Sequence, residues 1–194
     1  FTIIIFHLLQ DVADSGLFVN AISFGGTGIH AFILLSGFSL YYSYLNKPLS
    51  YIQFLQRRFG KIYLPYIIVV AISALLSFWL PLYQNTWYSF LGHVFMYKMF
   101  DDSIIVTYGY HLWFISTIIQ FYIVFFLLIR LKKLMSDWAF LGLAIVVSMS
   151  WISYILIIDK TDSLVLTRSM LEYLWEFAAG MVLAEIVFKG KSLP

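Results

Sequence analysis

The sequence contains no cysteine and very little charge. Of its 194 residues, 11% are charged and 62% are hydrophobic, and the mean hydropathy is +0.89. Without cysteine the chain has no disulfide, no thiolate metal ligand and no thiol nucleophile. Its 12 basic and 10 acidic residues leave a formal charge of +2, and they form no tract of the kind that binds nucleic acid. The composition therefore excludes a soluble globular domain and gives no sign of a nucleic-acid partner.

Long apolar runs are what the sequence has in abundance. They are too long and too continuous for the strands of a membrane β-barrel. We therefore predict an all-α fold, a polytopic transmembrane helical bundle that forms a single integral membrane domain over residues 1–194. Because the first residues already lie within an apolar run, we expect the N-terminal start, and later helices, to lie outside this sequence.

About six spans and one shorter helix are predicted. The segment Thr86–Phe100 is apolar, but at 15 residues it is shorter than the ~20 needed to cross a membrane, so we expect an interfacial or re-entrant helix on the outer face. The six predicted spans, the first seen only in part, are Phe1–Leu9, Thr27–Leu45, Tyr63–Tyr83, His111–Arg130, Trp138–Ile158 and Leu166–Phe188.

The charges between the spans predict the topology. The segments 46–62, 131–137 and 189–194 are basic, and the segments 10–26, 84–110 and 159–165 are neutral or acidic. Because basic loops stay in the cytoplasm, the first group is expected inside and the second outside. The chain is thus predicted to be a multi-pass protein of the cell membrane with both visible ends in the cytoplasm.

The most concentrated charge lies in the segment 54–66. Arg57, Arg58 and Lys61 would project within roughly a 100° arc if this segment is helical. We expect a basic amphipathic helix at the membrane surface, with Pro65 in the first turn of the following span. The cluster could simply hold this end in the cytoplasm, or it could bind an anionic substrate that enters from that side.

Four histidines fall in the predicted outer half of the bundle. A neutral imidazole at His7 could act as a general base toward a hydroxyl, although a histidine bonded to a neighbouring helix would look the same in sequence. Three of the four could also bind zinc, but none has the spacing of four residues that a helical metal site requires. The four histidines are His7, His30, His93 and His111.

Other polar residues within the spans are candidates for function because they are costly in a bilayer. Ser36 could be a nucleophile, but next to Gly37 it better fits close packing of helices. Glu172 and Glu176 are four residues apart, so we expect them to share a helix face that lines a wet cavity. Two further residues share a face of the fourth span and can hydrogen-bond between helices: Ser116 and Gln120.

Three stretches together resemble the acyltransferase-3 family of integral membrane acyltransferases. They are the Gly-rich element 25–38, with His30 where the family commonly has an acid, the basic element 54–65, with Lys61 in place of an arginine, and the element His111–Tyr122. His7 falls where the family has a histidine in its first helix, and Glu176–Gly180 resembles a later helix. The order and spacing of these elements extend over essentially the whole chain.

The resemblance implies transfer of an acyl group, often acetyl, from a cytoplasmic acyl-CoA to a hydroxyl of a carbohydrate. The acceptor would be a surface polysaccharide or its lipid-linked precursor. By resemblance, His7 is the catalytic base, and Arg57, Arg58 and Lys61 bind the donor phosphates. Acyl-CoA is then a co-substrate, the bilayer and a carbohydrate are the other partners, and no bound cofactor or metal is expected. The candidates for the acceptor site or for a supporting role are His30, His111, Trp113, Gln120 and Glu176.

Two alternatives follow from the same residues. A transporter or flippase for a lipid-linked sugar would use the polar residues within the membrane as a pathway, although no inverted repeat supports it. The chain could also be an inactive membrane scaffold fragment.

Overall fold

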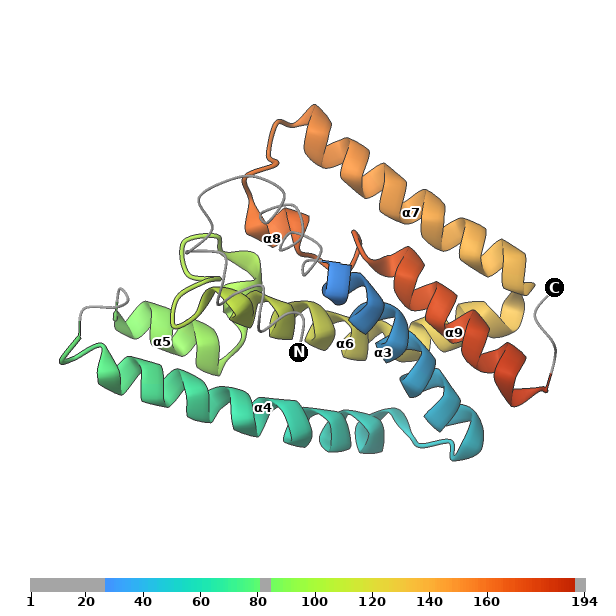
Figure 1. Ribbon diagram of the computed structural model, residues 1–194, viewed down its shortest axis with the longest axis horizontal. Helices are drawn as coiled ribbons and strands as arrows, with labels where there is room; N and C mark the ends of the chain where they lie inside the picture. Colours follow the sequence, from blue (N-terminus) through green and yellow to red (C-terminus); the bar gives the residue numbers. More distant parts are fainter. Residues whose placement is uncertain (1–26, 81–84, 191–194) are drawn as a thin grey trace, which may run out of the picture. The chain divides into compact units, whose positions relative to one another are not determined.

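The computed structural model describes residues 27–80 and 85–190, and every regular element in these ranges is helical (Figure 1). The predicted all-α fold is confirmed. The described chain forms two compact units: one contains its residues up to Pro48 and from Trp175 onward, and the other contains 49–174. In chain order the elements are α3 (Thr27–Asn46), α4 (Tyr51–Leu76), α5 (Trp87–Val94), η2 (Tyr97–Phe100), η3 (Tyr110–Leu112), α6 (Trp113–Leu134), α7 (Asp137–Ile157), α8 (Leu164–Thr167) and α9 (Leu174–Phe188).

In the first unit, α3 packs closely against α9 through a glycine on each helix. A Cβ atom on Gly37 would lie 2.1 Å from the carbonyl oxygen of Phe177, and one on Gly180 would lie 2.0 Å from that of Leu34. The two backbones therefore touch, as small residues permit between membrane helices. The packing role predicted for Gly37 is confirmed, and α3 matches the predicted second span to within one residue.

The second unit begins with α4, which is longer than predicted. Its first turn is closed by a capping box, in which the Ser50 hydroxyl accepts from the Gln53 amide and the Gln53 side chain accepts from the Ser50 amide. The helix then continues through Pro65, so the expected break between a surface helix and a span is wrong. Proline removes one backbone hydrogen bond, but the apolar run on its C-terminal side must stay helical in a bilayer, and membrane helices tolerate such a residue.

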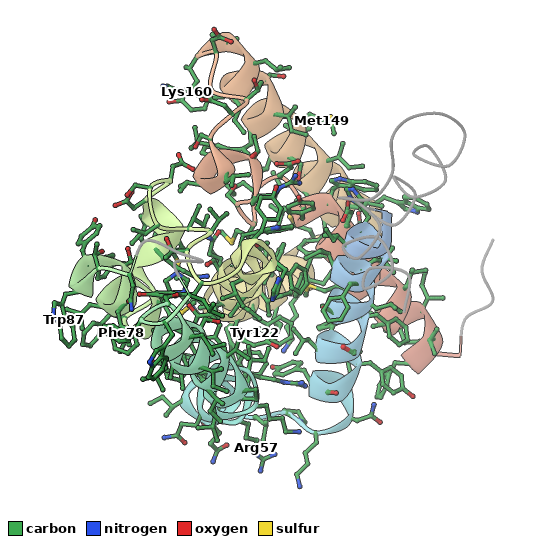
Figure 2. All side chains as sticks on the ribbon, turned by 60° about the vertical axis from the view of Figure 1, so that its left-hand side comes forward. Arg57, Phe78, Trp87, Tyr122, Met149 and Lys160 are labelled. Atoms are coloured by element: carbon green, nitrogen blue, oxygen red, sulfur yellow. The ribbon has the colours of Figure 1, made fainter. Side chains whose placement is uncertain are left out.

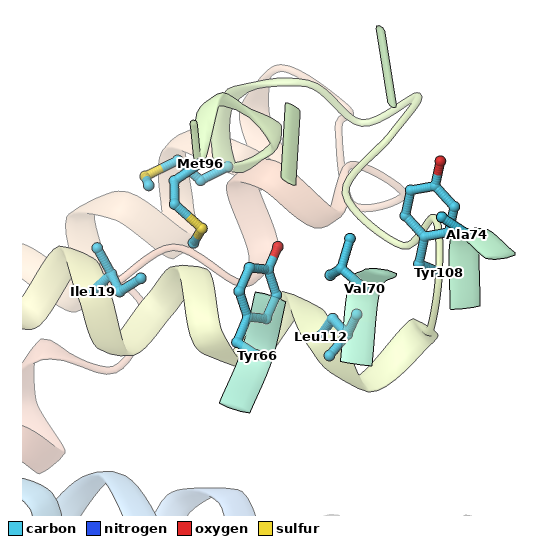
Figure 3. Close-up of a cluster of buried hydrophobic side chains, with 8 residues drawn as sticks. Tyr66, Val70, Ala74, Met96, Tyr108, Leu112 and Ile119 are labelled. Atoms are coloured by element: carbon cyan, nitrogen blue, oxygen red, sulfur yellow. The ribbon is translucent and has the colours of Figure 1, made fainter. Parts of the chain in front are cut away.

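The second unit is organised by antiparallel packing of α4 on α6 (Figure 1). Near the start of α4, the Phe54 ring stacks on Phe125, with centroids 4.9 Å apart, and meets Tyr122 edge-on at 5.8 Å. Further along α4, buried side chains meet the beginning of α6 in a hydrophobic cluster, which Figure 3 shows. This cluster contains Tyr66, Val70, Ala74, Met96, Met99, Tyr108, Leu112 and Ile119. The first turns of α4 therefore lie beside the second half of α6.

The segment 86–100 is helical but short, as predicted. It forms the eight-residue α5 and the four-residue η2, and neither is long enough to cross a membrane. Thr86 caps α5, since its hydroxyl accepts from the Ser89 amide at 3.1 Å. The Tyr63 hydroxyl of α4 donates to the Val94 carbonyl at 2.6 Å, which fixes the end of α5 on α4.

Three helices in the described part of the chain are long and apolar enough to span a membrane: Tyr51–Leu76, Tyr110–Leu134 and Asp137–Ile157. They correspond to the predicted third, fourth and fifth spans. The first predicted span, Phe1–Leu9, lies outside the described residues. At 26 residues α4 is about 39 Å long, which exceeds a hydrocarbon core of ~30 Å and leaves part of the helix for the interface.

The last predicted span, Leu166–Phe188, is not one helix. The chain forms α8, leaves helical geometry over 168–173, and resumes at Leu174 in the 15-residue α9. Glu172 therefore precedes α9 and Glu176 lies within it, so the prediction of one helix face shared by both is wrong. Hydrogen bonds from α6 and α7 to the backbone of the non-helical stretch stabilise this interruption.

We predict that Gly180→Ala destabilises the protein, because the new methyl group would overlap the Leu34 backbone. Displacing two packed helices costs about 1–3 kcal/mol, which lowers the midpoint of thermal unfolding in detergent by several degrees. Gly142→Ala in α7 is the matched control, because a Cβ there meets no atom within 4 Å. Equal midpoints for the two variants would contradict the close packing of α3 on α9.

Candidate functional site

The cationic face of α4 consists of Arg57, Arg58 and Lys61. Arg57 and Lys61 are exposed and Arg58 is half-buried; Figure 2 shows the Arg57 side chain extending away from the ribbon. Among the described residues, no carboxylate lies within salt-bridge distance of any of the three. Three cations without a counter-ion on one helix face provide a binding surface for a polyanion.

Basic residues of α6 lie at the same end of the second unit. Because α4 and α6 are antiparallel, the first turns of α4 lie toward the C-terminal half of α6, which carries Arg130, Lys132 and Lys133. Lys132 is 3% exposed and pairs with Asp137 at 2.5 Å, whereas Arg130 is exposed. Within this unit, the segments predicted to be cytoplasmic therefore meet at one end.

The segments predicted to face outward also meet. Ser163 donates to Asp102 at 2.5 Å, and the Val165 amide donates to the same carboxylate at 2.8 Å. These bonds join the loop after η2 to the start of α8. Arg57 and Lys160 lie far apart in Figure 2. The second unit thus places the two predicted groups of loops at different ends.

In the first unit, His30 and Glu176 form a close pair. The Nδ1 atom of His30 donates to the Glu176 carboxylate at 2.6 Å. Glu176 is 4% exposed, and its second oxygen has no hydrogen-bond partner in the described structure. The hydrogen bond of the carboxylate to Nδ1 orients the imidazole ring. The sequence singled out both residues without predicting that they meet.

Gln120 and Trp113 both contact the non-helical stretch 168–173. The Gln120 carbonyl accepts from the Met170 amide at 3.0 Å, and the Arg168 guanidinium lies 4.9 Å from the Trp113 ring centroid. Arg168 was not among the predicted site residues. It is the only cation between residues 164 and 188 of an apolar segment, which was the available signal.

The other histidines have separate surroundings. His93 is fully buried, with Nδ1 2.8 Å from the Tyr66 hydroxyl and Nε2 3.2 Å from the Ile104 carbonyl. His111 is exposed in η3, just before α6. His7 lies outside the described residues. Over 27–80 and 85–190, no three His, Cys, Asp or Glu side chains are placed to hold a metal ion.

A buried lysine lies beside His93. Lys98 is 0% exposed, and its ammonium donates to the Leu112 carbonyl at 2.8 Å. Burial lowers the pKa of Lys98 to about 7. Burial, and secondly the charge of Lys98, lowers the pKa of His93 to about 3. Burial therefore shifts both groups toward their neutral forms in the folded protein.

We predict that the folded state loses stability as the pH falls from about 6.5 to about 5. The unfolded chain binds a proton at His93 near its ordinary pKa of 6.5, whereas the folded chain binds it only near pH 3. Lys98, whose folded-state pKa is about 7, is mostly protonated in both states over this window and changes the stability in the same direction by a smaller amount. Thermal unfolding in detergent, followed by tryptophan fluorescence, should show that His93→Asn weakens the pH dependence. An unchanged dependence in His93→Asn would contradict the buried neutral imidazole.

A family model described as an acyltransferase domain, that of acyltransferase family 3, matches residues 1–194. Neither the curated proteins nor the solved structures gave a match. The family match includes the cationic face, the pair His30–Glu176 and the contacts around Gln120.

Proposed function

The chain belongs to the acyltransferase-3 family of membrane acyltransferases, and from this we propose that it is an O-acyltransferase. It transfers an acyl group, in our proposal acetyl, from cytoplasmic acyl-CoA to a hydroxyl of a carbohydrate. The acceptor is a surface polysaccharide or its lipid-linked precursor. The family match over the whole chain is the observation that carries this proposal.

The cationic face of α4 is the proposed donor-binding surface. CoA carries three phosphate groups, and Arg57, Arg58 and Lys61 offer three cations with no competing carboxylate in the described structure. Arginine matches two phosphate oxygens with its planar fork, and lysine adds a point charge. We place this end of the second unit in the cytoplasm, because the basic segments meet there.

His7 is the proposed catalytic base. It takes the proton from the acceptor hydroxyl while the oxygen attacks the thioester carbonyl, which forms a tetrahedral intermediate. The carbon–sulfur bond then breaks, the acyl group stays on the carbohydrate oxygen, and the proton passes to the departing CoA thiolate. Hydrogen-bond donors in a site that excludes water would stabilise the intermediate oxyanion.

The remaining candidates have supporting roles in this proposal. Glu176 orients the His30 imidazole through the hydrogen bond of 2.6 Å between its carboxylate oxygen and Nδ1 of the ring. Gln120 and Trp113 hold the stretch 168–173 against α6, and this keeps the non-helical backbone between α8 and α9 at a fixed position. His111 marks the start of α6 at the end opposite its basic residues.

We predict that His7→Ala abolishes acyl transfer, because it removes the proposed base, and that it leaves expression intact. The assay supplies labelled acetyl-CoA and a carbohydrate acceptor to the purified protein and detects product by mass spectrometry. Lys160→Ala is the control, since it changes an exposed residue outside the proposed site. Undiminished product with His7→Ala would remove this residue from the mechanism, and unlabelled acceptor with the unmodified protein would overturn the enzyme proposal.

A further inference from the structure

Arg168 is held rigidly by two aromatic residues. Its guanidinium lies 4.9 Å from the Trp113 ring centroid and donates to the Tyr173 hydroxyl at 2.9 Å. Trp113 and Tyr173 stack on each other, at an interplanar angle of 18°, and are 4% and 1% exposed. An arginine held in this way on aromatic faces loses little entropy when it binds a ligand.

The backbone around Arg168 is fixed as well. The Thr117 hydroxyl donates to the Arg168 carbonyl at 2.6 Å, and the Gln120 side chain accepts from the Met170 amide at 3.0 Å. From α7, the Ser148 hydroxyl donates to the Leu171 carbonyl at 2.8 Å. Three side chains from two helices thus hold the non-helical stretch in place.

Several buried donors at this position have no partner in the described structure. They are the Nε atom of Arg168 and the hydroxyls of Ser116 and Ser169. Ser116 is 2% exposed and lies on the same face of α6 as Trp113 and Gln120, which are three residues before it and four after it. The face of α6 that contacts the stretch 168–173 therefore carries an unused hydroxyl.

The positive charge of Arg168 has no carboxylate as an ion-pair partner among the described residues. In the described ranges no carboxylate lies within salt-bridge distance of Arg168, although Glu172 contributes to its electrostatic environment from further away. Buried donors without partners are rare in native proteins and are costly when left so. An anion with several acceptor oxygens and no donor supplies the kind of partner that a guanidinium and hydroxyls lack.

We propose that Arg168, Ser116 and Ser169 form a site for the phosphate group of a membrane lipid. The site lies beside the first two turns of α6, at the end of that helix opposite its basic residues. The stretch 168–173 is held by α6 and α7, both long and apolar enough to span a membrane, so we expect the phosphate to reach it from a bilayer leaflet on a molecule with an acyl or prenyl chain. By the charge distribution of the loops, this is the outer leaflet. The assignment goes beyond the acyl-transfer proposal and does not depend on it.

Native mass spectrometry of the full chain in detergent tests the proposal without any acyl transfer. The probes are phosphatidylglycerol, decaprenyl phosphate and inorganic phosphate. Phosphatidylcholine is the control lipid, because its choline cation balances the charge of its phosphate. We expect Arg168→Gln to weaken binding of an anionic lipid by about tenfold, which corresponds to ~1.4 kcal/mol. Arg168→Lys should restore part of the affinity, because it keeps the charge but not the fork.

Two further variants keep the test decisive. Ser116→Ala removes only a buried hydroxyl and should weaken binding about threefold even if Arg168→Gln does not fold. Lys160→Gln removes an exposed cation from the neighbouring loop and should leave binding unchanged. The anionic lipid whose affinity falls in the Arg168 and Ser116 variants identifies the class of lipid that carries the phosphate. Equal lipid binding by the unmodified protein and Ser116→Ala, or binding of inorganic phosphate as tight as that of either lipid, would overturn the proposal.

Discussion

The antiparallel packing of α4 on α6 is the constraint on which the organisation of the second unit depends. The ring of Phe54 contacts Tyr122 and Phe125 at one end, and Tyr66 joins the buried cluster with Leu112 and Ile119 at the other. Because the helices run in opposite directions, the basic first turns of α4 come to the basic end of α6. Aromatic packing thereby gathers cations that would repel one another if nothing else held them, and it creates the proposed donor-binding surface.

The same packing separates two kinds of chemistry along the helix axis. At one end of α6, Arg130 and Lys133 are at the surface with the cationic face of α4 nearby. At the other end, hydroxyl and amide side chains support irregular backbone between α8 and α9, where no carboxylate of the described residues lies within salt-bridge distance of Arg168. In a bilayer, backbone of this kind is tolerated only where other parts of the protein satisfy it, and such positions are commonly used to bind ligands.

Much of this arrangement follows from the sequence because hydropathy and charge act over whole segments. The ends of α3 and α7 were predicted to within one residue, because each is a long apolar run with polar residues at its ends, whereas α6 continues to Leu134, four residues beyond the predicted Arg130. Pro65 misled the prediction because a proline disfavours a helix locally, whereas capping at Ser50 and the apolar run after it favour one continuous helix. The break at 168–173 could not be predicted, because hydrogen bonds from residues 23 to 51 positions away in sequence stabilise it. His30 and Glu176, 146 positions apart, are brought together only by the packing of two glycine-bearing helices. His7 and the roles assigned to the cationic face stay predictions.

The central claim is that the cationic face of α4 lies in the cytoplasm and binds the phosphates of acyl-CoA. The absence of cysteine allows a direct measurement, because Gln56→Cys introduces a single thiol beside the intact cations. A membrane-impermeant maleimide should label this thiol only after cells are permeabilised, and acetyl-CoA should protect it, whereas Lys160→Cys should be labelled in intact cells without protection. Labelling of Gln56→Cys in intact cells, or no protection by acetyl-CoA, would contradict the account.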